Sequence, residues 1–244
     1  MATAPMKKTG FRQGIYEISA TAKEVLGTRR ILRDGREFVY AKAGASALSV
    51  GKMAVAADIA AEVSNQALPA TAIGATSLVY TASGAVTYAA DYFKGGFLQI
   101  NDATGEGAMY EIVGSTAVTA GTSITIVLGR PIINTALTTS SEGSLIHHPC
   151  MATIESADEE NMPVGVSPVA VTAAYYYWAQ TKGLANVLVS GTIAVFDMVV
   201  LGATAGSVKT LPDYGTATDP DMPLVGQAYR AGVDTEYTVI KLNL

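Results

Sequence analysis

The sequence is poor in the residue types that perform chemistry in most protein sites. Its 244 residues include one cysteine and two histidines, and charged residues make up only 15% of the chain. A lone cysteine excludes an internal disulfide. Ordinary soluble proteins are about a quarter charged, so this surface depends on Thr, Ser, Asn and Gly for its polarity. Such low charge is typical of proteins that remain packed against others.

Long apolar runs are also missing, although the mean hydropathy is +0.29. No stretch has the roughly 18 consecutive apolar residues that a membrane-spanning helix needs, and Asp197 interrupts the best run, GTIAVFDMVVLGA. The N-terminal MATAPMKKTGFRQG has two lysines but no apolar segment behind them, unlike a secretory signal. We expect a soluble protein that is made in the cytoplasm and has no membrane partner.

Motifs for metal binding and catalysis are not found either. His147, His148 and Cys150 stand together in LIHHPC, but adjacent histidines of a strand point to opposite faces and a structural zinc takes about four ligands. The acids of SADEENMP (156–163) lack the calcium-loop spacing. No histidine stands in a context that marks a catalytic base for a nucleophile. We therefore expect no metal, no cofactor and no enzymatic activity.

The stretch AGASALSVGKM (43–53) looks at first like a phosphate-binding loop. That loop requires four residues between its glycines and a hydroxyl after the lysine. Here six residues separate Gly44 from Gly51, and Met53 stands at the hydroxyl position. The pattern instead predicts a hairpin whose glycines turn strands, with residues 38–42 as its first strand.

Turn signals recur about every ten residues from residue 72 onward, which is typical of a β-sandwich or barrel. In GTSITIVLGRPI, for example, Ile124, Ile126 and Leu128 alternate with polar and smaller residues and are expected to face inward. The only helix candidate is KMAVAADIAAEVSNQ. The sequence thus predicts an all-β protein of small barrel or sandwich domains with an extended N-terminal arm.

Four parts are expected along the chain. Residues 1–36 form the basic arm, and residues 37–71 form a hairpin and connector that pack with the C-terminal part. Residues 72–150 form a β-rich middle domain, and residues 160–244 form a C-terminal barrel or sandwich. The acidic SADEENMP lies between the last two, which are either separate barrels or one merged sandwich.

Two internal echoes suggest repeated strand units. YYYWAQTKGLANVLVSG (175–191) resembles FVYAKAGASALSVG (38–51), which would align Gly191 with Gly51. MPVGVSPVAVTAAYYYW also resembles MPLVGQAYRAGVDTEYTV, because each passes from Met-Pro through a glycine-containing strand and a turn to a strand opened by tyrosine. Repeated strand units imply repeated packing roles.

Charge is distributed unevenly. Residues 1–45 hold nine basic and four acidic residues, a balance of +5, whereas the remainder holds seven basic and seventeen acidic residues, a balance of −10. A basic arm on an acidic body suggests that the two meet different surroundings. The acidic body also argues against nucleic acid as a partner.

The densest aromatic cluster is Tyr175-Tyr176-Tyr177-Trp178. It is either a stacking platform for sugars or bases or a structural group that supplies buried area. No basic residues interleave with the rings, which favours the structural role. We expect Tyr175, Tyr177 and Trp178 to lie in the core or at a subunit interface.

Several stretches together resemble the capsid decoration (cement) proteins of tailed bacteriophages. The resemblance covers about residues 30–244, and the YWAQTKG turn and the terminal DTEYTVIKLNL are its most distinctive parts. The stretches are GREFVYAKAGASALSVGKM, GGFLQINDATGEGAMYEIVG, ALTTSSEGSLI, PVGVSPVAVTAAYYYWAQTKGLANVLVSGTIAVFDMVVLGATAGSV and PLVGQAYRAGVDTEYTVIKLNL.

This resemblance implies an all-β protein, commonly a homotrimer, that binds the major capsid protein on the outside of the virion and braces the shell. It brings no catalytic residues. We expect the basic arm to reach acidic patches of the shell. The alternatives are another virion part, such as a tail or baseplate adaptor, and a carbohydrate- or receptor-binding module. The candidate capsid contacts are Lys7, Lys8, Arg12, Arg29, Arg30, Arg33 and Arg36.

Overall fold

The computed structural model describes residues 10–131, 135–212 and 222–244. Within these ranges the chain is almost entirely strands and turns, which confirms the predicted all-β class. A single 3-10 turn, η1 (Ala61–Val63), is the only helical element there. It lies in the stretch predicted as a possible helix, whose first residues instead form strand β3 (Met53–Val55).

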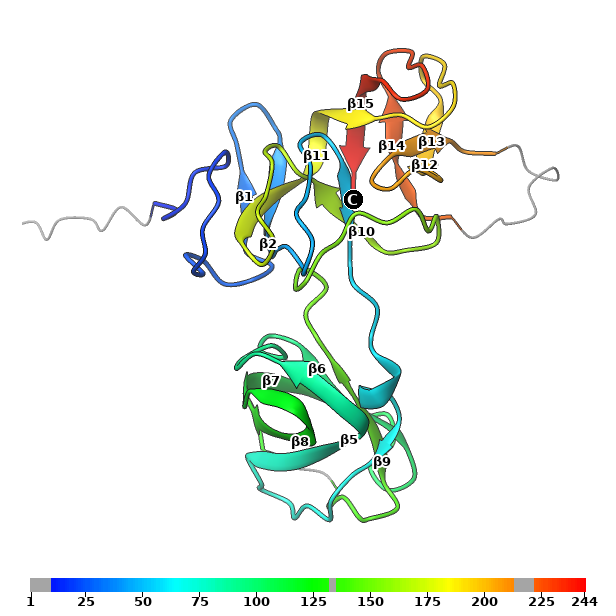
Figure 1. The fold of residues 1–244 in the computed structure, drawn as a ribbon. Coiled ribbons are helices and arrows are strands. Elements are labelled where there is room, and N and C mark those ends of the chain that lie inside the picture. Colours follow the sequence, from blue (N-terminus) through cyan, green and yellow to red (C-terminus); the bar gives the residue numbers. More distant parts are fainter. Residues whose placement is uncertain (1–9, 132–134, 213–221) are drawn as a thin grey trace, which may run out of the picture. The chain divides into compact units, whose positions relative to one another are not determined.

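The chain divides into two compact units (Figure 1). One is residues 57–151, and the other combines the chain up to Ala56 with Ala152–Leu244. The predicted division started the middle domain at residue 72 and packed residues 37–71 with the C-terminal part, but Val63 and Leu68 are buried in the core of the 57–151 unit. The connector therefore belongs with the middle of the chain, because its apolar side chains are buried there.

The 57–151 unit is a nearly closed six-stranded antiparallel barrel with the order β4-β9-β6-β7-β8-β5. Tyr80 of β5 reaches across the gap, and its hydroxyl bonds to the carbonyls of Val63 (2.7 Å) and Gly143 of β9 (3.0 Å). Ile124, Ile126 and Leu128 are buried, as their alternation predicted. The strands are β4 (Gln66–Ala67), β5 (Ser77–Tyr88), β6 (Phe97–Asp102), β7 (Met109–Ser115), β8 (Val118–Leu128) and β9 (Glu142–Ile146).

The other unit is built on one nine-stranded sheet, in which β1-β2-β11-β15-β14-β12-β13 form the main path and β10 pairs with both β11 and β3. All of these strand pairs are antiparallel. The strands not yet named are β1 (Arg29–Ile31), β2 (Glu37–Lys42), β10 (Pro163–Val166), β11 (Tyr176–Leu188), β12 (Met198–Leu201), β13 (Val208–Thr210), β14 (Leu224–Ala228) and β15 (Tyr237–Asn243).

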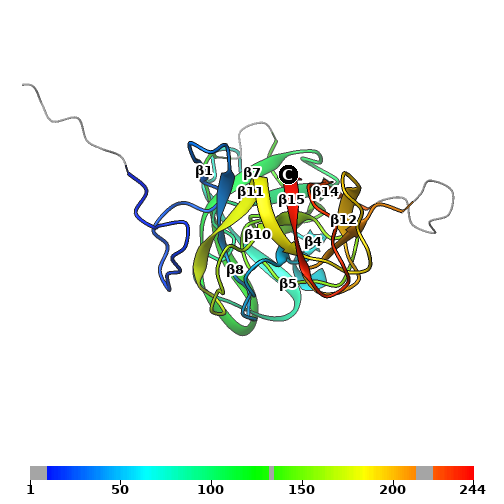
Figure 2. The same cartoon turned by 90° about the horizontal axis from the view of Figure 1, so that it is seen from above.

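Strand β11 organises this sheet because its two halves have different partners. The half Tyr176–Lys182 pairs with β2, whereas Lys182–Leu188 pairs with β15; Figure 2 shows β11 beside β15. Two buried clusters follow the same division. Phe38, Tyr40 and Trp178 form the first. The second is aliphatic, and the members that come from β11, β12 and β15 are Ala185, Val187, Val199, Leu201, Ile240 and Leu242.

Two pairs of turns in this unit are built alike. Leu48 and Val171 exchange backbone hydrogen bonds of 2.9 and 2.8 Å, and Ile193 and Gly232 do the same at 3.0 and 2.9 Å. We call Leu48, Val171, Ile193 and Gly232 the bridge residues. A strand begins five residues after each of them, and these strands start at Met53, Tyr176, Met198 and Tyr237. We call each of these arrangements a paired turn, since one turn closes on the other through reciprocal bonds.

The third residue after each bridge residue is left-handed. Gly51, Ala174, Phe196 and Thr235 have φ values of 73°, 62°, 72° and 66°. Each donates its N–H to the carbonyl four residues before the partner's bridge residue. The same bonds therefore occur four times, although only one left-handed position is glycine. The acceptors, in the same order, are Ser167, Gly44, Ala228 and Val189.

The paired turns test the two sequence echoes. Gly165 and Gly226 lie six residues before the bridge residues Val171 and Gly232. A methyl group on either glycine would meet the backbone carbonyl nine residues after that bridge residue. These carbonyls belong to Gln180 and Lys241. This confirms the echo between the two Met-Pro segments. The other echo had the wrong register, because matching the turns aligns Gly51 with Phe196 rather than with Gly191.

The 57–151 barrel is inserted into the other unit between two hydrogen-bonded residues. Val55 and Ile154 exchange backbone bonds of 2.9 and 3.0 Å. The chain therefore leaves this unit and returns to it at almost the same place.

Gly226→Ala should destabilise the unit that contains it. A methyl group there would meet the Lys241 carbonyl of the adjacent strand, and backbone cannot move aside easily, so we expect a loss of about 1–3 kcal/mol in the free energy of unfolding. Urea denaturation followed by the fluorescence of Trp178, the only tryptophan, measures this loss.

Gly10→Ala is the control, because a methyl group at Gly10 meets no atom within 4 Å. Equal midpoints for the two variants would contradict the packing argument.

Candidate functional site

Over residues 10–131, 135–212 and 222–244, no group of three or more His, Cys, Asp and Glu side chains is placed to hold a metal ion. In the same ranges, no helix has the length and apolarity to cross a membrane.

The histidine pair of LIHHPC makes structural contacts within the barrel unit. Nδ1 of His148 accepts the backbone N–H of Cys150 at 3.0 Å. The His147 ring packs edge-on against Tyr92, with centroids 5.6 Å apart. Burial, together with the neighbouring His147, lowers the pKa of His148 below its ordinary value of 6.5. The neutral ring is the form that accepts the Cys150 bond.

The predicted basic contact residues fall into different environments, and Lys7 and Lys8 lie outside the described residues. The Arg30 side chain already has partners within the protein. Its guanidinium donates to the Gln13 carbonyl at 2.9 Å and lies 4.8 Å from the Phe11 ring centroid. Arg36 is also engaged, through Asp34 at 2.8 Å and the Tyr16 hydroxyl at 3.3 Å.

The other three predicted arginines, Arg12, Arg29 and Arg33, are exposed. None of them takes part in an ion pair within the described part of the chain. Arg29 lies on β1 and Arg33 on the turn that follows it. These side chains are available to a partner, whereas Arg30 and Arg36 contribute to the fold.

Gln13 fixes the described part of the arm to the sheet. Its side chain is 3% exposed and donates to the Tyr176 carbonyl (3.0 Å), and its Oε1 accepts the Tyr40 hydroxyl (2.6 Å). Its own carbonyl accepts the indole N–H of Trp178 at 3.1 Å. Residues 10–28 hold no regular strand, yet these bonds attach them to the core.

The aromatic cluster contributes mainly to the interior. Tyr177 and Trp178 are fully buried within the chain. The Tyr177 hydroxyl lies 3.0 Å from Oγ1 of Thr153, and the Trp178 ring packs edge-on against Tyr40. Tyr175 is half-buried. Neither Tyr177 nor Trp178 presents a stacking surface to solvent.

An exposed face of the nine-stranded sheet was not predicted from the sequence. Leu184, Lys241, Gln227 and Met198 are cross-strand neighbours that form one row over β11, β15, β14 and β12. Leu184 and Met198 are 48% and 41% exposed. We call this row and the hollows beside it the outer face. Its signal in the sequence is strand alternation, in which Leu184 and Met198 occupy the outward positions.

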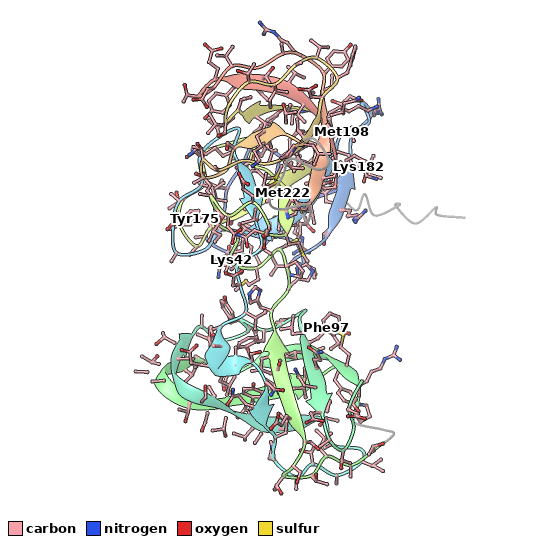
Figure 3. The ribbon with its side chains drawn as sticks, turned by 90° about the vertical axis from the view of Figure 1, so that its right-hand side faces the viewer. Lys42, Phe97, Tyr175, Lys182, Met198 and Met222 are labelled. Atoms are coloured by element: carbon pink, nitrogen blue, oxygen red, sulfur yellow. The ribbon has the colours of Figure 1, made fainter. Side chains whose placement is uncertain are left out.

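Two hollows accompany the row. The first, of about 410 Å³, is lined mainly by apolar side chains, among them Val50, Pro168, Leu184 and Tyr237. The second, of about 460 Å³, includes Lys182, Met198, Leu224 and Lys241. Figure 3 shows Lys182 and Met198 on the same side of this unit. Apolar patches with polar neighbours are typical of protein-binding surfaces.

Further apolar side chains are exposed at the second paired turn. Phe196, Tyr229 and Val233 are exposed by 65%, 61% and 58%. The Phe196 N–H bonds to the Ala228 carbonyl, which places Phe196 next to Tyr229 in space. The loops of this turn thus add a second apolar area to the same unit.

Gln13→Ala should loosen residues 10–28 and destabilise their unit. The change leaves the Tyr40 hydroxyl and the Tyr176 carbonyl without these partners, which typically costs about 1–3 kcal/mol. Urea unfolding followed by Trp178 fluorescence, with limited proteolysis of the arm, measures both effects. Arg12→Ala, at the exposed neighbouring residue, should change the free energy of unfolding by less than about 0.5 kcal/mol. Equal effects of the two changes would rule out the anchoring role of Gln13.

The barrel unit should lose stability in mild acid. Because the pKa of His148 is lower in the folded state than in the unfolded chain, the unfolded chain binds more protons as pH falls below about 6.5. Stability is therefore full well above that pH and declines as the pH falls through it. Scanning calorimetry should show a weaker decline for His148→Asn, whose side-chain oxygen replaces the Nδ1 acceptor. Parallel profiles for the two proteins would contradict this assignment.

Comparison with known proteins gave no relative: no protein-family model, no curated protein and no solved structure matches this chain.

Proposed function

We propose that this protein is a structural component of a tailed-bacteriophage particle that binds the outside of the capsid and stabilises it. The observation that carries the proposal is the outer face, where Leu184 and Met198 lie exposed in one row and each lines one of the two hollows. A sheet face of this kind supports extended contact with another protein. The proposal also draws on the resemblance of residues 30–244 to decoration proteins.

The physical logic is repeated, shape-matched contact. Many identical copies can stabilise a capsid lattice even when each interface is modest. A homotrimer would add to this effect, because its three subunits can bind the capsid together. The partner in this proposal is the major capsid protein. The small charged fraction of 15% suits such contacts, because few charges need to be desolvated when the surfaces meet.

The two rival functions have less support. A carbohydrate-binding module would use the rings of Tyr175 to Trp178, but Trp178 is fully buried and its indole N–H is bonded to Gln13. A tail or baseplate adaptor would share the same fold and composition. Binding to purified capsids and to purified tails separates the adaptor from the decoration protein.

Saturable co-sedimentation with capsids that lack this protein is the expected result. The double variant Leu184→Glu with Met198→Glu should weaken binding by roughly a hundredfold, because burying two added charges at the contact costs several kcal/mol even though Lys241 lies opposite Leu184. Both side chains are exposed, so the fold should persist.

Val79→Glu provides the matched control, because Val79 is also 48% exposed but lies on the barrel unit. Binding of the wild-type chain to tails and not to capsids would overturn the proposal in favour of the adaptor. Light scattering of the free protein tests the homotrimer.

A further inference from the structure

Strand β1 has one unpaired edge. It stands at the end of the strand order and pairs only with β2. Tyr40 donates its N–H to the Thr28 carbonyl, and Leu32 donates to the Arg36 carbonyl, both at 2.9 Å. Backbone groups alternate in direction along an antiparallel strand. The N–H and C=O of Arg29 and Ile31 therefore point away from β2, and no described residue pairs with them.

The side chains at this edge are exposed as well. Ile31 is 68% exposed, and the two exposed arginines, Arg29 and Arg33, lie two residues to either side of it. Arg30 points to the opposite face, where it bonds to the Gln13 carbonyl. The edge thus presents an apolar side chain between two cations that are in no ion pair among the described residues.

Charge decides which segment can pair with this edge. Two copies of β1 that paired antiparallel about Ile31 would set Arg29 opposite Arg33, and like charges in that position are destabilising. The chain's first nine residues carry two lysines and no acid, so they have the same sign as the edge. Carboxylates opposite the arginines would instead be favourable.

We propose that β1 accepts an extended acidic segment of a partner protein as an added strand. In such pairing, main-chain bonds supply affinity and alternate side chains supply specificity. The segment would place an apolar residue opposite Ile31 and an Asp or Glu two residues to either side, opposite Arg29 and Arg33. The inference rests on the proposed function in one respect: if the partner is the major capsid protein, the acidic segment belongs to that protein.

The first test uses the full chain and two synthetic peptides, TETVTET and its basic counterpart TKTVTKT. Nuclear magnetic resonance titration should show that the acidic peptide shifts the backbone amide signals of Arg29 and Ile31 and that the basic one does not. The double variant Arg29→Glu with Arg33→Glu should bind the acidic peptide roughly tenfold more weakly. Arg230→Glu, at an exposed arginine elsewhere in the same unit, should leave its affinity unchanged.

Ile31→Pro tests the backbone edge itself. Proline there removes only an N–H that points away from β2, as proline on edge strands does, so the β1–β2 bonds and the Trp178 fluorescence should be preserved while peptide binding is lost. If this variant does not fold, the double arginine variant carries the test. The inference is overturned if the two peptides give equal shifts, or none, in the wild-type chain.

The capsid assay separates this inference from the proposed function. Capsid binding that survives in both β1 variants would leave the decoration role intact and remove the edge as its contact. Peptide binding by a chain that does not bind capsids would have the opposite meaning, since the acceptor edge would stand and the decoration role would fall.

Discussion

The reciprocal backbone bonds of the paired turns are the constraint on which the larger unit depends. They join segments that are far apart in the chain, Leu48 to Val171 and Ile193 to Gly232, and each fixes where the following strand starts. Buried backbone groups need hydrogen-bond partners. When the N–H groups of one turn donate to the carbonyls of another turn, the strands that follow both turns are held in register. The long strand β11 can then pair with β2 in one half and β15 in the other.

The same arrangement explains why apolar side chains remain at the surface. Side chains alternate between the two faces along a strand, so β11 and β15 bury the neighbours Ala185 and Ile240 on one face and expose the next pair, Leu184 and Lys241, on the other. The anchoring by Gln13 acts similarly at the N-terminal end. It holds the half-buried Arg30 against Phe11 and leaves Arg29 exposed.

Sequence reasoning succeeded where the signal was local. The alternation of Ile124, Ile126 and Leu128 predicted buried strand positions, and the Met-Pro echo identified a true structural repeat. It failed where the signal lay in distant partners. Phe196 occupies a left-handed position that no glycine marks, so the other echo was set in the wrong register. The different roles of Arg29 and Arg30 depend on which face of β1 is covered, which the charge pattern alone does not encode.

The bond between Val55 and Ile154 has a consequence for how this architecture can change. A domain whose two ends meet on hydrogen-bonded neighbours adds little closure entropy to its host, and such sites tolerate insertion and replacement. The 57–151 barrel is therefore a module that evolution, or an engineer, can exchange for cargo with adjacent termini. In the capsid role proposed above, each copy would display that cargo at a regular spacing.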